Sequence, residues 1–349
     1  MIHCAVAALR VESNASETAV SNRSTGMKNP VSKNSCRRMA VALLAMCPVV
    51  GSSADANLQS LEKTGRTLRV YYIGNSVTDT IRYQPLAELA ATRDVKIEWG
   101  RHMIPGAPLE WLHGHRDEGF REKPYGGWHD ALTGFAWDAV SFQPFDRSFT
   151  ATNKAGEAVG DLDIITAWSK LAAEKNPDVR ILVYARWPRM RSEGKPFNFD
   201  KDDYDPSKPG NGYDLSKLDA WSSCWEAGYD PATSKGSNES REYFEKLHAA
   251  VVGTTKFLKR PAELVRVGHA MAALDAKMEA GEVPGHTTMW QLYRDGIHLN
   301  ENGSYLVGCV YFATLLRENP AGLPTTSYGS VDPNLAPLLQ QIAWEVSSK

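Results

Sequence analysis

The sequence LRVYYIGNSVT occupies positions 68–78 and joins an apolar run to a short polar turn. Residues 68–73 are rich in β-branched and aromatic side chains, which predicts a strand that ends at Gly74. The next segment, 81–92, repeats leucine and alanine at helical spacing. A strand, a polar turn and a helix in this order predict the first unit of an α/β fold.

The same alternation continues along the chain. Further strands are predicted at 95–99, 137–143, 180–184 and 264–267, and further helices at 109–115, 161–174, 239–258, 269–280 and 302–316. The last of these is the final strongly amphipathic helix that the pattern predicts. Strand-helix alternation of this kind favours a parallel sheet covered by helices on both faces.

One segment interrupts this rhythm. Residues 187–238 are rich in Pro, Gly, Asp and aromatic side chains and have no steady period. A loop of this length inside a compact domain is usually functional or forms a small subdomain. The sequence contains no internal repeat, so we predict a single domain over 57–349 that carries this irregular insertion.

The N-terminal segment differs from the rest of the chain. Several basic residues precede an apolar run at 39–50, and the small residues Ala54 and Ala56 follow it. This order is typical of a secretory signal, and the run is too short to span a bilayer. We therefore expect residues 1–56 to be an N-terminal extension and signal peptide, cleaved near Ala56, and the protein to be periplasmic or extracellular. A short buried helix is the alternative.

The composition is that of an ordinary globular protein, with 42% hydrophobic and 23% charged residues among 349. A formal net charge of −2 provides no positive surplus for a phosphate backbone, which argues against a nucleic-acid partner. No second apolar stretch reaches membrane-spanning length, so we expect no stable membrane insertion of the mature chain. Beyond residue 56 the only cysteines are Cys224 and Cys309, which could pair in an oxidising compartment.

Polar residues follow several of the predicted strands, where open parallel sheets bind their ligands. Ser76, Gly106 and Gln143 follow the first three strands. Asp295 and His298 stand three residues apart, just before the helix at 302–316. A serine becomes a good nucleophile when an imidazole takes its proton and a carboxylate orients that imidazole. We therefore predict a catalytic triad of Ser76, His298 and Asp295.

An oxyanion formed by attack of Ser76 would need preorganised donors. The available ones are the N–H of Ser76, the N–H of Gly106 and the side-chain amide of Gln143. Each residue alone also has a structural explanation, such as a helix N-cap for Ser76 or a turn for Gly106. Their joint order favours the catalytic interpretation.

Four short blocks resemble the SGNH, or GDSL-like, hydrolases: Gly74-Asn75-Ser76, Gly106, the amide of Gln143 and Asp295-x-x-His298. The resemblance spans residues 68–299. It implies a flavodoxin-like three-layer α/β/α fold, serine esterase chemistry without a metal or other cofactor, and, in exported bacterial members, removal of acyl groups from sugars. Asn75 departs from the usual Asp. Gln143 replaces the usual Asn, and its longer arm fits only if the strand ends about one methylene farther back.

Several other residues are candidates for substrate binding: Asn75, Arg186, Trp187 and Arg294. The two arginines could contact an anionic substrate or form ordinary ion pairs. The insertion also gathers aromatic residues that could stack on sugar rings or, more often, form a satellite core: Trp187, Tyr204, Tyr213, Trp221, Trp225 and Tyr229.

A metal site is the weakest alternative. His113 and His115 could be grouped with His102, His129 and Asp130, but they lack an established ligand spacing, so we predict no metal.

Taken together, the sequence predicts a serine esterase that hydrolyses acyl esters, foremost acetyl esters, on a carbohydrate. Two alternatives stay open. One is a non-catalytic glycan-binding protein on the same fold, and the other is an O-acyltransferase that uses the same triad with a sugar acceptor in place of water.

Overall fold

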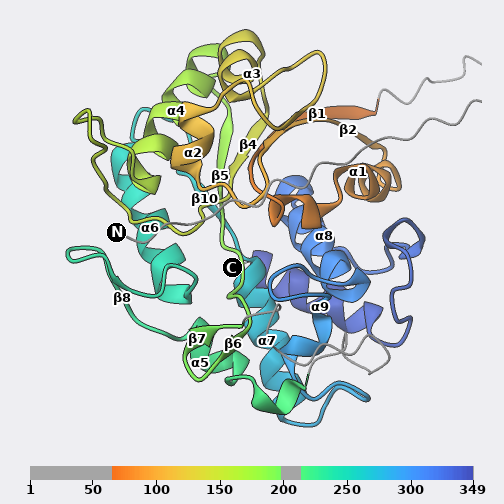
Figure 1. The fold of residues 1–349 in the computed structure, drawn as a ribbon. Helices are drawn as coiled ribbons and strands as arrows, with labels where there is room; N and C mark the ends of the chain where they lie inside the picture. Colours follow the sequence, from red (N-terminus) through yellow and green to blue (C-terminus); the bar gives the residue numbers. More distant parts are fainter. Residues whose placement is uncertain (1–64, 198–213, 349) are drawn as a thin grey trace, which may run out of the picture. The chain divides into compact units, whose positions relative to one another are not determined.

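The computed structural model describes residues 65–197 and 214–348, which form a sheet with helices on both faces (Figure 1). Within these residues the main sheet has six strands in the order β10-β5-β4-β1-β2-β3. The strands are β1 (Arg66–Gly74), β2 (Val95–Met103), β3 (Phe120–Arg121), β4 (Ala139–Phe142), β5 (Arg180–Tyr184) and β10 (Glu263–Val265). All neighbouring pairs are parallel except β2 and β3. The predicted three-layer α/β/α architecture is confirmed.

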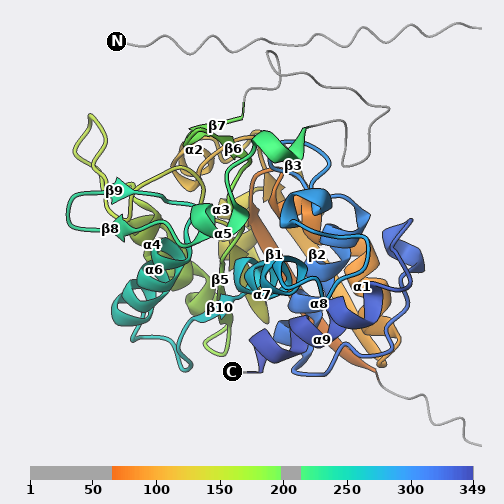
Figure 2. The same ribbon diagram turned by 90° about the horizontal axis from the view of Figure 1, so that it is seen from below.

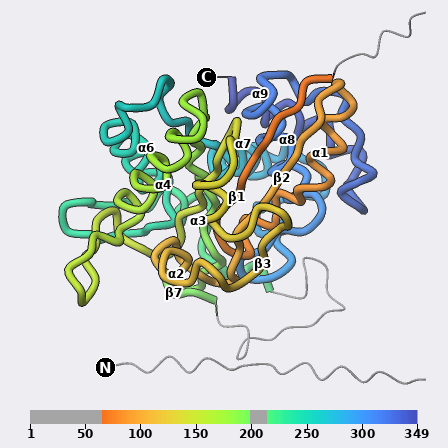
Figure 3. The backbone as a smooth tube through the Cα atoms, turned by 90° about the horizontal axis from the view of Figure 1, so that it is seen from above, coloured from red at the N-terminus to blue at the C-terminus, as the bar shows by residue number. Residues whose placement is uncertain are grey.

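Two groups of helices pack on the two faces of the sheet (Figures 2 and 3). One group comprises α2 (Leu109–Gly114), α3 (Trp128–Gly134), α4 (Asp161–Lys175) and α6 (Arg241–Thr254). The other comprises α1 (Tyr83–Ala91), α7 (Val267–Glu279), α8 (Glu301–Leu316) and α9 (Ala336–Ser347).

The prediction for the end of the chain was wrong in one respect. Helix α8 is not amphipathic, because every residue from Gly303 to Leu316 is buried. It packs against α1, α7 and α9, and this surrounds it with protein. The final amphipathic helix is α9, which the pattern analysis missed.

The central strands are buried on both faces, which explains their nearly continuous apolar sequences. Residues of β4 and β5 are buried throughout, as is the second half of β1. Their register places the strand ends level, because Ile73 of β1 pairs with Phe142 of β4 and with His102 of β2. The loops that follow these strands therefore start at one edge of the sheet, the edge where such folds bind ligands.

The insertion has only short elements in its described part: the pair β6 (Arg191–Ser192) and β7 (Lys195–Pro196), the pair β8 (Tyr229–Asp230) and β9 (Lys235–Gly236), the 3₁₀ turn η2 (Leu215–Lys217) and α5 (Trp221–Trp225). Trp187, Trp221, Trp225 and Tyr229 are buried and belong to the main hydrophobic core, so they form neither a separate satellite core nor a sugar-stacking surface. Tyr204 and Tyr213 lie outside the described residues.

Other sequence predictions have mixed outcomes. Cys224 and Cys309 are both buried free thiols, so the structure contains no disulfide between them. Two of the histidines that were weighed as metal ligands have other partners, since His102 contacts the Glu118 carbonyl oxygen and His115 stacks on Trp111. The predicted leader and its cleavage site lie outside the described residues. Within 65–197 and 214–348, none of the helices is both long and apolar enough for a membrane span.

Candidate active site

Ser76 lies at the tip of a loop, residues 74–78, that directly follows β1; we call it the serine loop. The loop turns so tightly that a Cβ at Gly74 would lie 2.0 Å from Thr78 Oγ1. Only glycine permits this approach. Ser76 is half-buried, whereas the residues on either side of it are buried. The tight turn therefore brings the Ser76 hydroxyl to the rim of the sheet.

Asn75 and Gln143 hold the serine loop from below, and both are fully buried. The Asn75 Nδ2 donates to the Ala107 carbonyl oxygen over 3.1 Å, and its Oδ1 accepts from the Val77 N–H over 3.0 Å. The Gln143 Oε1 accepts from the Asn75 N–H over 3.1 Å and from the Thr78 hydroxyl over 3.0 Å. Asn75 therefore shapes the loop, and the prediction that it contacts substrate was wrong.

Asp295 and His298 lie in the histidine loop, which begins at Tyr293 and ends at Leu299. These two end residues form an antiparallel bridge, so the loop closes on itself just before α8. The Asp295 Oδ1 accepts from the backbone N–H of His298 over 2.7 Å and of Ile297 over 2.9 Å. The carboxylate thus fixes the shape of the loop as well as the imidazole.

The two loops meet at one hydrogen-bonded relay. His298 Nε2 lies 2.8 Å from Ser76 Oγ, although 222 positions separate the residues in the sequence. His298 Nδ1 lies 2.8 Å from Asp295 Oδ2. Burial raises the pKa of Asp295, but hydrogen bonds from the His298 ring and from two backbone N–H groups outweigh burial and leave this pKa below its usual value. A carboxylate at Nδ1 keeps the proton there and leaves Nε2 free to accept the serine proton.

Two backbone donors lie near this relay without a protein partner. Among the described residues, neither the Ser76 N–H nor the Gly106 N–H forms a hydrogen bond. Gly106 has a left-handed φ of 68°, is exposed, and has no atom within 4 Å of where its Cβ would be. The side-chain amide of Gln143 does not act as the third oxyanion donor that the sequence predicted. Its amide is inaccessible, and its Nε2 donates to the Pro144 carbonyl oxygen over 2.8 Å.

The structure also revises two of the other predicted substrate contacts. Arg186 and Trp187 are fully buried, so neither side chain can reach a ligand. The Trp187 indole N–H donates to the Ile297 carbonyl oxygen over 2.6 Å and so supports the histidine loop. Arg294 is exposed, with its Nε 3.7 Å from Asp295 Oδ2, and its contact with a substrate stays a prediction.

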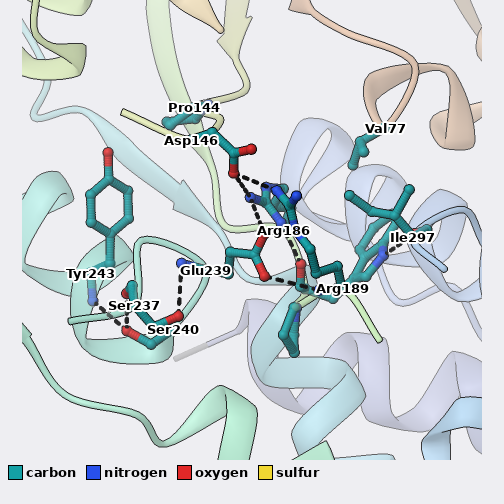
Figure 4. Close-up of polar contacts among 12 residues, drawn as sticks. Val77, Pro144, Asp146, Arg186, Arg189, Ser237, Glu239, Ser240, Tyr243 and Ile297 are labelled. Atoms are coloured by element: carbon teal, nitrogen blue, oxygen red, sulfur yellow. Dashed lines mark hydrogen bonds and ion pairs between the residues drawn. The ribbon is translucent and has the colours of Figure 1, made fainter. Parts of the chain in front are cut away.

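A cluster of four charged side chains that the sequence analysis largely missed lies beside the two loops (Figure 4). Asp146 follows β4, Arg186 and Arg189 follow β5, and Glu239 precedes α6. The carboxylates of Asp146 and Glu239 each bind both guanidinium groups. Burial raises the pKa of Glu239, but the two arginines outweigh burial and lower it overall. The rule of searching after each strand could have found Asp146 and Arg189, but no sequence signal pointed to Glu239.

These observations define the class to which the chain belongs: a three-layer α/β/α protein with a Ser-His-Asp relay at the edge where its parallel strands end. No protein-family model matches the chain, and no curated protein matches it. Similar solved structures include a DUF4886 family protein from Bacteroides uniformis, at 17% identity and a TM-score of 0.46, covering 80% of this chain and 94% of that one. A candidate GDSL-like lipase from Parabacteroides merdae shares 14% identity at a TM-score of 0.35, covering 70% of this chain and 93% of that one.

Proposed function

We propose that this protein is a serine hydrolase that cleaves acyl esters, foremost acetyl esters, of a carbohydrate. The observation that carries the proposal is the relay in which His298 lies 2.8 Å from both the Ser76 hydroxyl and the Asp295 carboxylate. Such geometry lets an imidazole take the serine proton while the carboxylate stabilises the resulting positive charge. The choice of a sugar as the alcohol part of the ester rests on the resemblance to the SGNH hydrolases, and export of the protein rests on the N-terminal sequence pattern.

The reaction would proceed in two halves. Ser76 Oγ attacks the acyl carbonyl as His298 Nε2 takes its proton, and the N–H groups of Ser76 and Gly106 stabilise the oxyanion. The protonated imidazole then gives its proton to the departing sugar hydroxyl, which leaves an acyl group on Ser76. A water molecule, deprotonated by His298, attacks this acyl-enzyme and releases the carboxylic acid and the free serine.

The test is hydrolysis of 4-nitrophenyl acetate by the wild type, by Ser76→Ala and by a matched control, Ser216→Ala. Ser216 is an exposed serine in the insertion. We expect Ser76→Ala to abolish turnover and Ser216→Ala to retain it. Labelling by a fluorophosphonate should follow the same pattern, because the reagent needs an activated serine. Hydrolysis that survives in Ser76→Ala contradicts the nucleophile assignment.

The same assay separates the two alternatives. A wild type that hydrolyses no ester but binds acetylated glycans would support the glycan-binding alternative. Acetyl groups that pass to an added sugar faster than to water would support the O-acyltransferase alternative.

A further inference from the structure

The charged cluster beside the relay has one face that is open to solvent. Arg189 and Asp146 are 26% and 35% exposed, whereas Arg186 is fully buried and Glu239 is 2% exposed. The segment that carries Arg189 is hydrogen-bonded to the histidine loop, because the Met190 N–H donates to the Gly296 carbonyl oxygen over 2.8 Å and the Trp187 indole donates to the Ile297 carbonyl oxygen over 2.6 Å. Figure 4 draws Val77 and Ile297 to the right of the charged cluster. Those two residues directly follow the proposed nucleophile and directly precede the proposed base. The exposed pair therefore borders the place where an ester would react.

The buried members of the cluster fix the orientation of the exposed pair. The Glu239 carboxylate accepts from both the side-chain Nε and the backbone N–H of Arg189, the latter over 3.1 Å. Arg186 reaches the same carboxylate and lies over the Phe145 ring, with its Cζ 4.5 Å from the ring centroid. Arg189 lies over the same ring at 5.3 Å. A guanidinium held in this way loses little conformational freedom when a ligand binds.

Not every polar atom of the pair is used within the protein. The Asp146 Oδ1 accepts from both arginines, while its Oδ2 has no partner among the described residues. Arg189 uses Nε and one Nη2 proton, and its Nη1 likewise has no partner in the part of the chain that the structure describes. The ion-paired side chains of Arg189 and Asp146 thus keep one donor group and one acceptor oxygen for a ligand.

The charges of the cluster select the kind of ligand. Two arginines face two carboxylates, so the cluster is neutral and offers no excess attraction to an anion. A neighbouring donor and acceptor instead match two adjacent hydroxyl groups, one of which accepts a hydrogen bond while the other donates. Asp146 also has a left-handed φ of 54°, an uncommon conformation for a residue other than glycine that clusters at functional sites.

We infer that Arg189 and Asp146 form the subsite that binds two adjacent hydroxyl groups of the alcohol part of the ester. This inference rests on the proposed hydrolase function and adds the residues that select a polyhydroxylated leaving group. Arg186, Glu239 and Phe145 act only as positioning residues.

The experiment compares two leaving groups of similar size. The substrates are cyclohexyl acetate, which has no free hydroxyl, and a panel of mono-O-acetylated methyl glycosides of glucose, galactose, mannose and xylose. Released acetate gives kcat/KM for the wild type, Arg189→Gln and Asp146→Asn. The second variant keeps the shape of the side chain and turns the outward acceptor into a donor. Arg241→Gln, which removes a half-buried arginine of α6 that pairs with Glu226, is the matched control.

We expect the wild type to prefer at least one glycoside over cyclohexyl acetate, and each subsite variant to lower kcat/KM for that glycoside by about 10- to 100-fold, mainly through KM. Turnover of cyclohexyl acetate should change less than threefold. An equal loss on both substrates, or a wild type without preference for any glycoside, would overturn the subsite. The proposed hydrolase function fails separately, if no ester is cleaved or if cleavage survives Ser76→Ala.

Discussion

Replacement of Asp295 by asparagine tests the relay most directly. In the native protein the Asp295 Oδ1 binds two backbone N–H groups, and Oδ2 accepts the Nδ1 proton of His298 over 2.8 Å. An asparagine keeps the two backbone bonds when its carbonyl oxygen takes the Oδ1 position. Its NH₂ group then faces Nδ1, so the imidazole must move its proton to Nε2. A protonated, neutral Nε2 cannot accept the proton of Ser76.

We therefore expect Asp295→Asn to fold normally and to lose about 10³- to 10⁴-fold in kcat, equivalent to about 4–5.5 kcal/mol of transition-state stabilisation. The assay is 4-nitrophenyl acetate hydrolysis, with thermal unfolding as a measure of the fold. Ser216→Ala is the control, since it changes an exposed side chain of the insertion and should alter kcat by less than threefold. A stable Asp295→Asn protein that keeps a tenth of the wild-type kcat would refute the role given to this carboxylate.

The remaining predictions concern support, protonation and metals. Gln143→Met should lower the free energy of unfolding by about 1–3 kcal/mol, because it leaves the buried Asn75 N–H without an acceptor; urea unfolding measures it. Trp187→Phe should lower the free energy of unfolding by about 1–3 kcal/mol, because it leaves the Ile297 carbonyl oxygen unpaired. It should also lower kcat more than it raises KM. Burial raises the pKa of Asp161 to about 7. The folded protein therefore holds the Asp161 proton more tightly than the unfolded chain does. This contribution to the free energy of unfolding is complete below about pH 4 and is lost as the pH rises through 7, so Asp161→Asn should make the free energy of unfolding less dependent on pH in that range. Incubation with EDTA should leave turnover unchanged, since the proposed relay uses no metal.

Local patterns in the sequence predicted the strands and the polar positions that follow them. Hydrophobic periodicity located β1, β2, β4 and β5 to within a few residues, because buried parallel strands have nearly continuous apolar sequences. The residue types after those strands pointed to Ser76, and the three-residue spacing of Asp295 and His298 before the last predicted helix pointed to His298. The structure brings the Ser76 and His298 side chains within hydrogen-bonding distance. Their catalytic roles stay predictions.

What the sequence could not predict depends on contacts between distant segments. Gln143 has the donor groups of an oxyanion-binding amide, but its direction is set by the Asn75 N–H, 68 positions away. The sequence alone allowed Arg186 to contact a substrate. In the structure it pairs in the interior with Glu239, which lies 53 positions further along the chain. Helix α8 was misjudged for a similar reason, because its burial depends on α9, which local hydrophobicity did not reveal.

The 2.8 Å contact between Ser76 and His298 depends on two strands that contribute neither residue. The serine loop is held by Gln143, which follows β4. The histidine loop is held by the segment after β5, through the Trp187 indole and through the Met190 N–H, which donates to the Gly296 carbonyl oxygen over 2.8 Å.

Strands β4 and β5 are paired in register, with Phe142 opposite Val183. The pairing of these strands therefore fixes the distance between the two loops. Loss of either supporting side chain, Gln143 or Trp187, should lengthen the hydrogen bond between Ser76 and His298. We therefore expect Gln143→Met and Trp187→Phe together to lower kcat by less than the product of their separate effects. Each substitution alone already disturbs the alignment of Ser76 with His298. Additive losses in the double variant would show that the two loops are positioned independently.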